Sequence, residues 1–111
     1  NSSMSKLNAI KGLGADIKEM PRVEWFDLIL SDDPQEAMEG LYISPFNNRA
    51  VIAGQGTIGV EIVEDLPDVD AVITPFGGGG LTAGVASAIR ILKPDARLYA
   101  CELETGAPLA P

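Results

Sequence analysis

Histidine is absent from the 111 residues, and cysteine occurs only once, at Cys101. A histidine-based catalytic triad, a histidine-ligated zinc site and an internal disulfide therefore cannot be built from this chain alone. A chain without disulfides suits a reducing compartment, and no signal-peptide pattern is visible. We therefore expect a cytoplasmic protein.

Basic residues are half as numerous as acidic ones, with 8 Lys and Arg against 16 Asp and Glu, and the net charge is −8. Nucleic acids and anionic membrane surfaces attract positive charge, so this balance argues against both as partners. No apolar run approaches the length of a membrane span. The hydrophobic content of 46% and the charged content of 22% are ordinary for a soluble globular protein.

Glycine, in contrast, is concentrated in one place. Residues 71–93 read AVITPFGGGGLTAGVASAIRILK: a short apolar run, four consecutive glycines from Gly77 to Gly80, and a stripe of helical period. Glycines gather where the backbone must approach something closely. The first turn of a helix has unpaired N–H groups and the positive end of the helix dipole, which together favour an anion such as a phosphate ester. The stretch therefore predicts a phosphate site, and a flexible connector is the alternative interpretation.

Helical stripes alternate with short apolar runs along the whole chain, which predicts an α/β fold. Helices are expected around residues 7–13, 33–40, 50–65 and 81–92, and strands at 15–17, 41–44, 71–75 and 97–101. The last two strands and the helix between them should form a parallel βαβ unit. Residues 18–30 fit neither period and are expected to pack in a core. Gly54, Gly56 and Gly59 are expected to allow close contact with a neighbouring backbone.

The motif PFGGGGLTAG, with NNRAVIAGQGTIGVEI upstream, resembles the serine/threonine dehydratase family. These are pyridoxal-phosphate enzymes of fold type II, and serine racemase is a relative. The resemblance extends from about residue 6 to residue 107. It implies a three-layer α/β sandwich with a parallel sheet and helices on its faces, of which this chain is an internal fragment. Residues 1–45 would end the smaller domain, and residues 46–111 would form part of the larger, cofactor-binding domain.

The resemblance also implies an activity for the full-length protein: a pyridoxal-phosphate-dependent ammonia-lyase acting on a small hydroxy-amino acid such as serine or threonine. The cofactor phosphate would be held by backbone N–H groups of Gly77, Gly78, Gly79, Gly80 and Leu81. An amino-acid racemase of the same family is an alternative, because racemisation uses the same carbanion. We also expect a homo-oligomer.

Glu102 aligns with a position where some relatives hold a divalent cation, and a carboxylate suits such an ion. Those relatives use a second acidic group a few residues further on, which residues 105–108 lack. A surface glutamate at the end of a strand is therefore the alternative interpretation.

Two other function classes fit parts of the pattern. The segment from Gly78 to Ala83 also satisfies G-x-G-x-x-A, and Glu102 ends the next strand, as in a nicotinamide-dinucleotide-binding fragment. A structural or binding fragment without catalysis is the third possibility. The Schiff-base lysine of the dehydratases belongs to a segment that precedes the matched region, and Lys6, Lys11, Lys18 and Lys93 are expected at the surface. The chain alone is therefore expected to be inactive.

Overall fold

The computed structural model of the chain describes residues 3–29, 31, 34 and 39–104. The helices and strands are α1 (Met4–Gly12), α2 (Arg22–Ile29), α3 (Arg49–Asp65), β1 (Ala71–Pro75), α4 (Gly80–Leu92) and β2 (Arg97–Cys101). They belong to two compact units, Asn1–Tyr42 and Ile43–Pro111. Within the described ranges, every helix is too short or too polar to cross a membrane.

The first unit contains two short helices with local stabilising contacts. The Ser3 hydroxyl accepts a hydrogen bond from the Lys6 N–H at 3.4 Å and caps the start of α1. Gly14 follows the end of α1 in a left-handed conformation with a φ of +82°, which glycine adopts readily at the end of a helix. In α2 the rings of Trp25 and Phe26 meet edge to face, with centroids 5.0 Å apart.

Three sequence-based expectations for this region are wrong. Residues 15–17 and 41–44 have irregular backbone and form no strand. A strand needs a neighbour for its backbone hydrogen bonds, and the only described strand pairing is that of β1 with β2. Residues 18–30 do not form a core segment: they include the helix α2, none of whose described side chains is buried. The helix expected at residues 33–40 falls largely outside the described residues.

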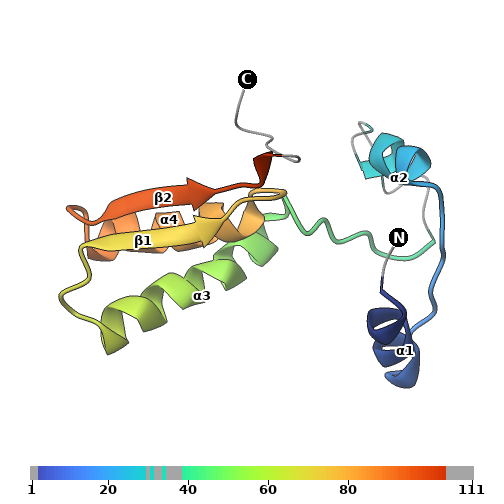
Figure 1. The fold of residues 1–111 in the computed structure, drawn as a ribbon, viewed down its shortest axis with the longest axis horizontal. Coiled ribbons are helices and arrows are strands. Elements are labelled where there is room, and N and C mark those ends of the chain that lie inside the picture. The colour runs from blue at the N-terminus through green and yellow to red at the C-terminus, as the bar shows by residue number, and fades with distance from the viewer. Residues whose placement is uncertain (1–2, 30, 32–33, 35–38, 105–111) are drawn as a thin grey trace. The chain divides into compact units, whose positions relative to one another are not determined.

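The second unit confirms the parallel βαβ arrangement. Strands β1 and β2 pair in parallel, with Ala71 opposite Arg97 and Pro75 opposite Cys101. Figure 1 shows α3 and α4 on the same side of the two strands. The core lies between β1, α4 and the turn before β2, where Val72, Val85, Ile89 and Ala96 are buried. Helix α3 adds Ile62 and Val63 to this cluster.

Glycines bring α3 and α4 unusually close together. A Cβ atom at Gly59 would lie 2.8 Å from the Ala88 Cβ and 2.9 Å from the Val85 carbonyl oxygen. On the other helix, a Cβ at Gly84 would overlap the Ile52 carbonyl oxygen. The expected backbone contact is thus present at Gly56 and Gly59 but not at Gly54, whose Cβ would have no described atom within 4 Å.

The face of the sheet opposite the helices is apolar and exposed. Ile73 and Tyr99 are paired across the two strands and are 67% and 48% exposed. Neighbouring positions that point to the helix side, Val72 and Thr74, are buried. The described part of this unit therefore covers only one face of its sheet.

We expect the isolated 111-residue chain to self-associate, because an uncovered apolar face and open strand edges favour pairing with another chain. Light scattering over a concentration series would measure this. Replacing both Ile73 and Tyr99 with threonine should reduce the association, since threonine keeps β-propensity while removing apolar surface. A monodisperse monomer of the parent chain at high concentration would show that the face does not drive association.

Candidate functional site

The glycine-rich loop joins the end of β1 to the start of α4. The Phe76 N–H donates to the Cys101 carbonyl oxygen at 2.7 Å, which fixes the start of the loop to the last residue of β2. The Ala83 N–H donates to the Gly79 carbonyl oxygen at 2.8 Å, so Gly79 is the N-cap of α4. The N–H groups of Gly80, Leu81 and Thr82 precede this bond and have no acceptor within the helix. The loop thus has the predicted strand–glycine–helix geometry.

Each glycine of the loop has a different environment. Gly79 has a φ of +86°, which an L-amino acid with a side chain rarely adopts. A Cβ at Gly80 would lie 2.7 Å from the Pro45 carbonyl oxygen, and a Cβ at Gly78 would overlap the Phe46 ring. A Cβ at Gly77 would have no described atom within 4 Å. Two of the four glycines therefore accommodate a neighbouring turn, and Gly77 alone faces open space.

The neighbouring turn is held by the side chain of the residue before it. Its residues 45–47 follow the buried Ser44, whose hydroxyl accepts hydrogen bonds from the N–H groups of Phe46 at 3.2 Å and Asn47 at 3.4 Å. The next residue, Asn48, caps α3 by accepting from the Ala50 N–H at 2.9 Å. An asparagine before a helical stripe is a signal that could have predicted this cap.

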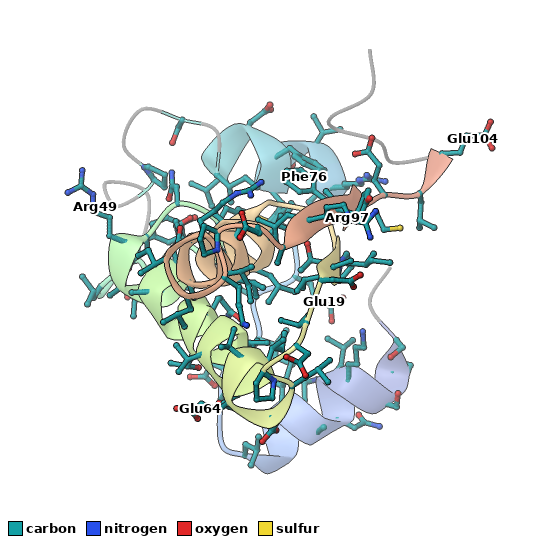
Figure 2. All side chains as sticks on the ribbon, turned by 90° about the vertical axis from the view of Figure 1, so that its left-hand side faces the viewer. Glu19, Arg49, Glu64, Phe76, Arg97 and Glu104 are labelled. Atoms are coloured by element: carbon teal, nitrogen blue, oxygen red, sulfur yellow. The ribbon has the colours of Figure 1, made fainter. Side chains whose placement is uncertain are left out.

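The starts of α3 and α4 consequently lie at the same end of the unit. Figure 1 shows both N-terminal ends where the two strands finish, and Figure 2 shows Arg49 and Glu64 at the two ends of α3. Each N-terminus carries about half a positive charge from its helix dipole. The sequence has no lysine or arginine between Arg49 and Arg90. Residues 50–89 therefore add no basic side chain at this end of the unit, where backbone N–H groups and Arg49 at the start of α3 are the positive groups.

Two threonine hydroxyls connect the strand to the helix beneath the loop. The Oγ1 atoms of Thr74, in β1, and Thr82, in the first turn of α4, are 3.0 Å apart. The Thr82 hydroxyl also lies 3.3 Å from the Pro75 carbonyl oxygen. Thr74 is buried, and its hydroxyl lies 3.5 Å from the Tyr99 carbonyl oxygen. The sequence patterns do not predict this pair, because Thr74 lies in a strand and Thr82 in a helix, and the side chains of the two elements repeat with different periods.

The remaining candidate residues do not join the loop. Lys6, Lys11 and Lys18 are exposed on the first unit, and Lys93 ends α4 at the opposite end from the glycines. Glu102 directly follows β2 and is half-buried. Across the described ranges, no three Cys, Asp or Glu residues come together as they would around a metal ion. The cation site at Glu102 stays a prediction.

A groove of about 410 Å³ lies between α3 and α4, with Arg49 in its lining. Its lining is mostly small or apolar and includes Ile52, Ala53, Val60, Ala88 and Ile91. None of the predicted cofactor-binding residues is part of this lining. The groove is therefore separate from the predicted phosphate site.

Comparison with known proteins identifies the family. The profile described as pyridoxal-phosphate dependent enzyme matches residues 1–111. The chain belongs to the pyridoxal-phosphate dependent enzyme family. This family implies pyridoxal phosphate as the cofactor, which supports that interpretation of the loop over the dinucleotide one.

Its relatives include dehydratases and racemases. Over 103 residues, the chain is 41% identical to the L-threonine ammonia-lyase of Thermotoga maritima, covering 91% of this chain and 25% of the relative. It is 39% identical to the serine racemase of Bos taurus over 94 residues, which are 85% of this chain and 28% of that relative. The structure of maize serine racemase superposes with a TM-score of 0.79 at 32% identity, covering 96% of this chain and 32% of that one. The chain thus spans about a quarter of the length of these curated relatives.

The residues of the loop fit a cofactor phosphate. A phosphate ester needs several convergent N–H donors and room to approach them. The start of α4 offers such donors, and the Gly77 side of the loop is open among the described residues. The loop is part of the stretch that matches the family, and its geometry favours the same kind of ligand.

Proposed function

We propose that this chain is part of a pyridoxal-phosphate-dependent ammonia-lyase of the serine/threonine dehydratase type, in which Gly77, Gly78, Gly79, Gly80 and Leu81 hold the cofactor phosphate. The observation that carries the proposal is the glycine loop at the N-terminus of α4, in a chain that matches the family from end to end. The substrate would be a small hydroxy-amino acid, in keeping with the threonine ammonia-lyase among the relatives.

The bound cofactor supplies an electron sink for the negative charge that develops on the substrate's α-carbon. The residues of this chain contribute anchoring and orientation. N–H groups at the start of α4 bind the phosphate, and the helix dipole favours its negative charge. The turn at Pro45 and Phe46 supports Gly78 and Gly80 from the other side. A fixed phosphate fixes the ring, and precise placement of reacting groups lowers the barrier.

A racemase of the same family is the second candidate, and a serine racemase is among the relatives. The phosphate loop would serve both activities equally. The assignment of residues 1–45 to the smaller domain and 46–111 to the larger one belongs to this proposal. The proposal also includes a homo-oligomeric state, a cytoplasmic location and a divalent cation bound at Glu102.

Purified full-length protein loaded with pyridoxal phosphate would test the activity. We expect the protein to release a keto acid from L-threonine or L-serine, which a coupled dehydrogenase assay would measure. The release should stop when the cofactor is removed. The isolated 111-residue chain should release none, because its lysines lie far from the loop in sequence or at the opposite end of α4. Formation of D-serine without keto acid would instead favour the racemase, and absence of both products would contradict the family-based activity.

A further inference from the structure

We propose that the hydroxyl groups of Thr74 and Thr82 position the phosphate loop. They are positioning residues, because neither is assigned a contact with the cofactor through its side chain. The inference rests on the proposed phosphate site and adds the device that holds the site in shape. Their Oγ1 atoms are 3.0 Å apart and join the end of β1 to the first turn of α4 across the base of the loop.

The hydrogen bonds of this pair can be satisfied in two ways. In one, the Thr82 hydroxyl donates to the Pro75 carbonyl oxygen at 3.3 Å, and the Thr74 hydroxyl donates to Thr82. In the other, Thr82 donates to Thr74, and Thr74 donates to the Tyr99 carbonyl oxygen at 3.5 Å. Both arrangements tie the helix start to the sheet. Each arrangement uses both hydroxyls, so removing one of them costs its partner a hydrogen bond; of the two side chains Thr74 is buried and Thr82 partly buried.

The pair adds a side-chain attachment between the strand and the helix at the base of the loop. At its start the loop is held by the hydrogen bond from Phe76 to Cys101. In its middle, Gly78 and Gly80 pack against Phe46 and Pro45. Within the described residues, the N-cap Gly79 supplies no side-chain capping bond to α4. Thr82 therefore provides the side-chain link that fixes the N–H groups of the first turn relative to the strands.

Replacing Thr82 with valine keeps the side-chain shape and removes the hydroxyl, whereas Thr82→Ser keeps the hydroxyl. We expect Thr82→Val to raise the Kd of full-length apoprotein for pyridoxal phosphate about fivefold, a loss typical of one hydrogen bond. The serine variant should stay within twofold of the parent, which is about 0.4 kcal/mol. Pyridoxal, which lacks the phosphate, should bind all three proteins with the same affinity.

Amide hydrogen exchange in the absence of cofactor provides a second measurement. Exchange of the peptide covering residues 76–83 should be faster in Thr82→Val than in the parent, and Thr74→Val should have the same effect. A valine variant that is less stable overall would also exchange faster in α3. Faster exchange at residues 76–83 with unchanged exchange in α3 therefore reports local loosening of the loop. Equal loss of affinity for pyridoxal and pyridoxal phosphate would overturn the inference, and so would unchanged exchange at residues 76–83.

Failure of the positioning role can be distinguished from failure of the phosphate-site assignment. If a negative charge placed at Gly77 weakens pyridoxal-phosphate binding but Thr82→Val does not, the site is right and the positioning role is wrong. If neither substitution affects binding, the phosphate site is wrong as well.

Discussion

Replacing Gly84 with alanine is expected to destabilise the protein by about 3 kcal/mol, the upper range for overpacking in a tight core. The added Cβ would overlap the Ile52 carbonyl oxygen and lie 2.8 Å from the Gly56 nitrogen. These are backbone atoms of α3, so no side chain can rotate away to relieve the overlap. The two helices would have to separate, which would loosen the packing around Val85 and Ile89.

Gly54→Ala is the matched control for this substitution. Gly54 also lies in a helix, but its Cβ would meet no described atom within 4 Å. Alanine there should stabilise the protein by about 0.5–1 kcal/mol, because alanine has the higher helix propensity. Thermal unfolding of the full-length parent and both variants would measure the difference. Equal melting temperatures for the two variants would mean that α3 and α4 are not in close backbone contact.

Local sequence signals predicted the second unit much better than the first. The glycine loop, α4 and the parallel pairing of β1 with β2 follow from an apolar run, a turn signal and a helical stripe that agree with one another. Residues 15–17 and 41–44 also contain apolar runs. A run of three or four residues specifies a strand only if a partner strand lies beside it, and no local pattern reports that partner.

The environment of the loop could be predicted only in part. Four consecutive glycines indicated close approach by another group, and the expected group was a phosphate. The structure shows that Gly78 and Gly80 also accommodate the turn at Pro45 and Phe46, which lies more than thirty residues earlier in the chain. Contacts between distant segments depend on the tertiary fold, so the pattern of either segment alone does not contain them. The pair formed by Thr74 and Thr82 is only eight residues apart, but its members belong to a strand and a helix, whose side-chain periods differ, so neither pattern predicts their contact.

This packing changes how the phosphate site should be tested. A β-branched residue at Gly78 would collide with Phe46, and a side chain at Gly79 would be strained by its φ of +86°. Weakened cofactor binding by either variant would therefore have two explanations. Gly77 avoids both problems, because its φ is not positive and its Cβ has no described neighbour within 4 Å.

We expect Gly77→Asp to raise the Kd of the full-length apoprotein for pyridoxal phosphate at least about tenfold more than Gly77→Asn does, because both side chains occupy the same space and only aspartate is charged. Aspartate and asparagine have nearly the same shape, so the comparison isolates charge. Two unit charges ~4 Å apart interact by about 4 kcal/mol at an effective dielectric constant of ~20, and salt reduces this repulsion. Since a tenfold change in Kd needs only about 1.4 kcal/mol, the effect should persist in physiological salt.

Lys93→Gln provides the control for net charge, since it also makes the chain more negative by one unit but lies at the far end of α4. It should leave the Kd unchanged. Titration with pyridoxal phosphate, monitored by the absorbance of the bound cofactor, would give the Kd values of the parent and the three variants. Raising the salt concentration should reduce the difference in Kd between the aspartate and asparagine variants. Equal binding by these two variants at low salt would place the phosphate elsewhere. The glycines would then serve only the packing of the loop against Pro45 and Phe46.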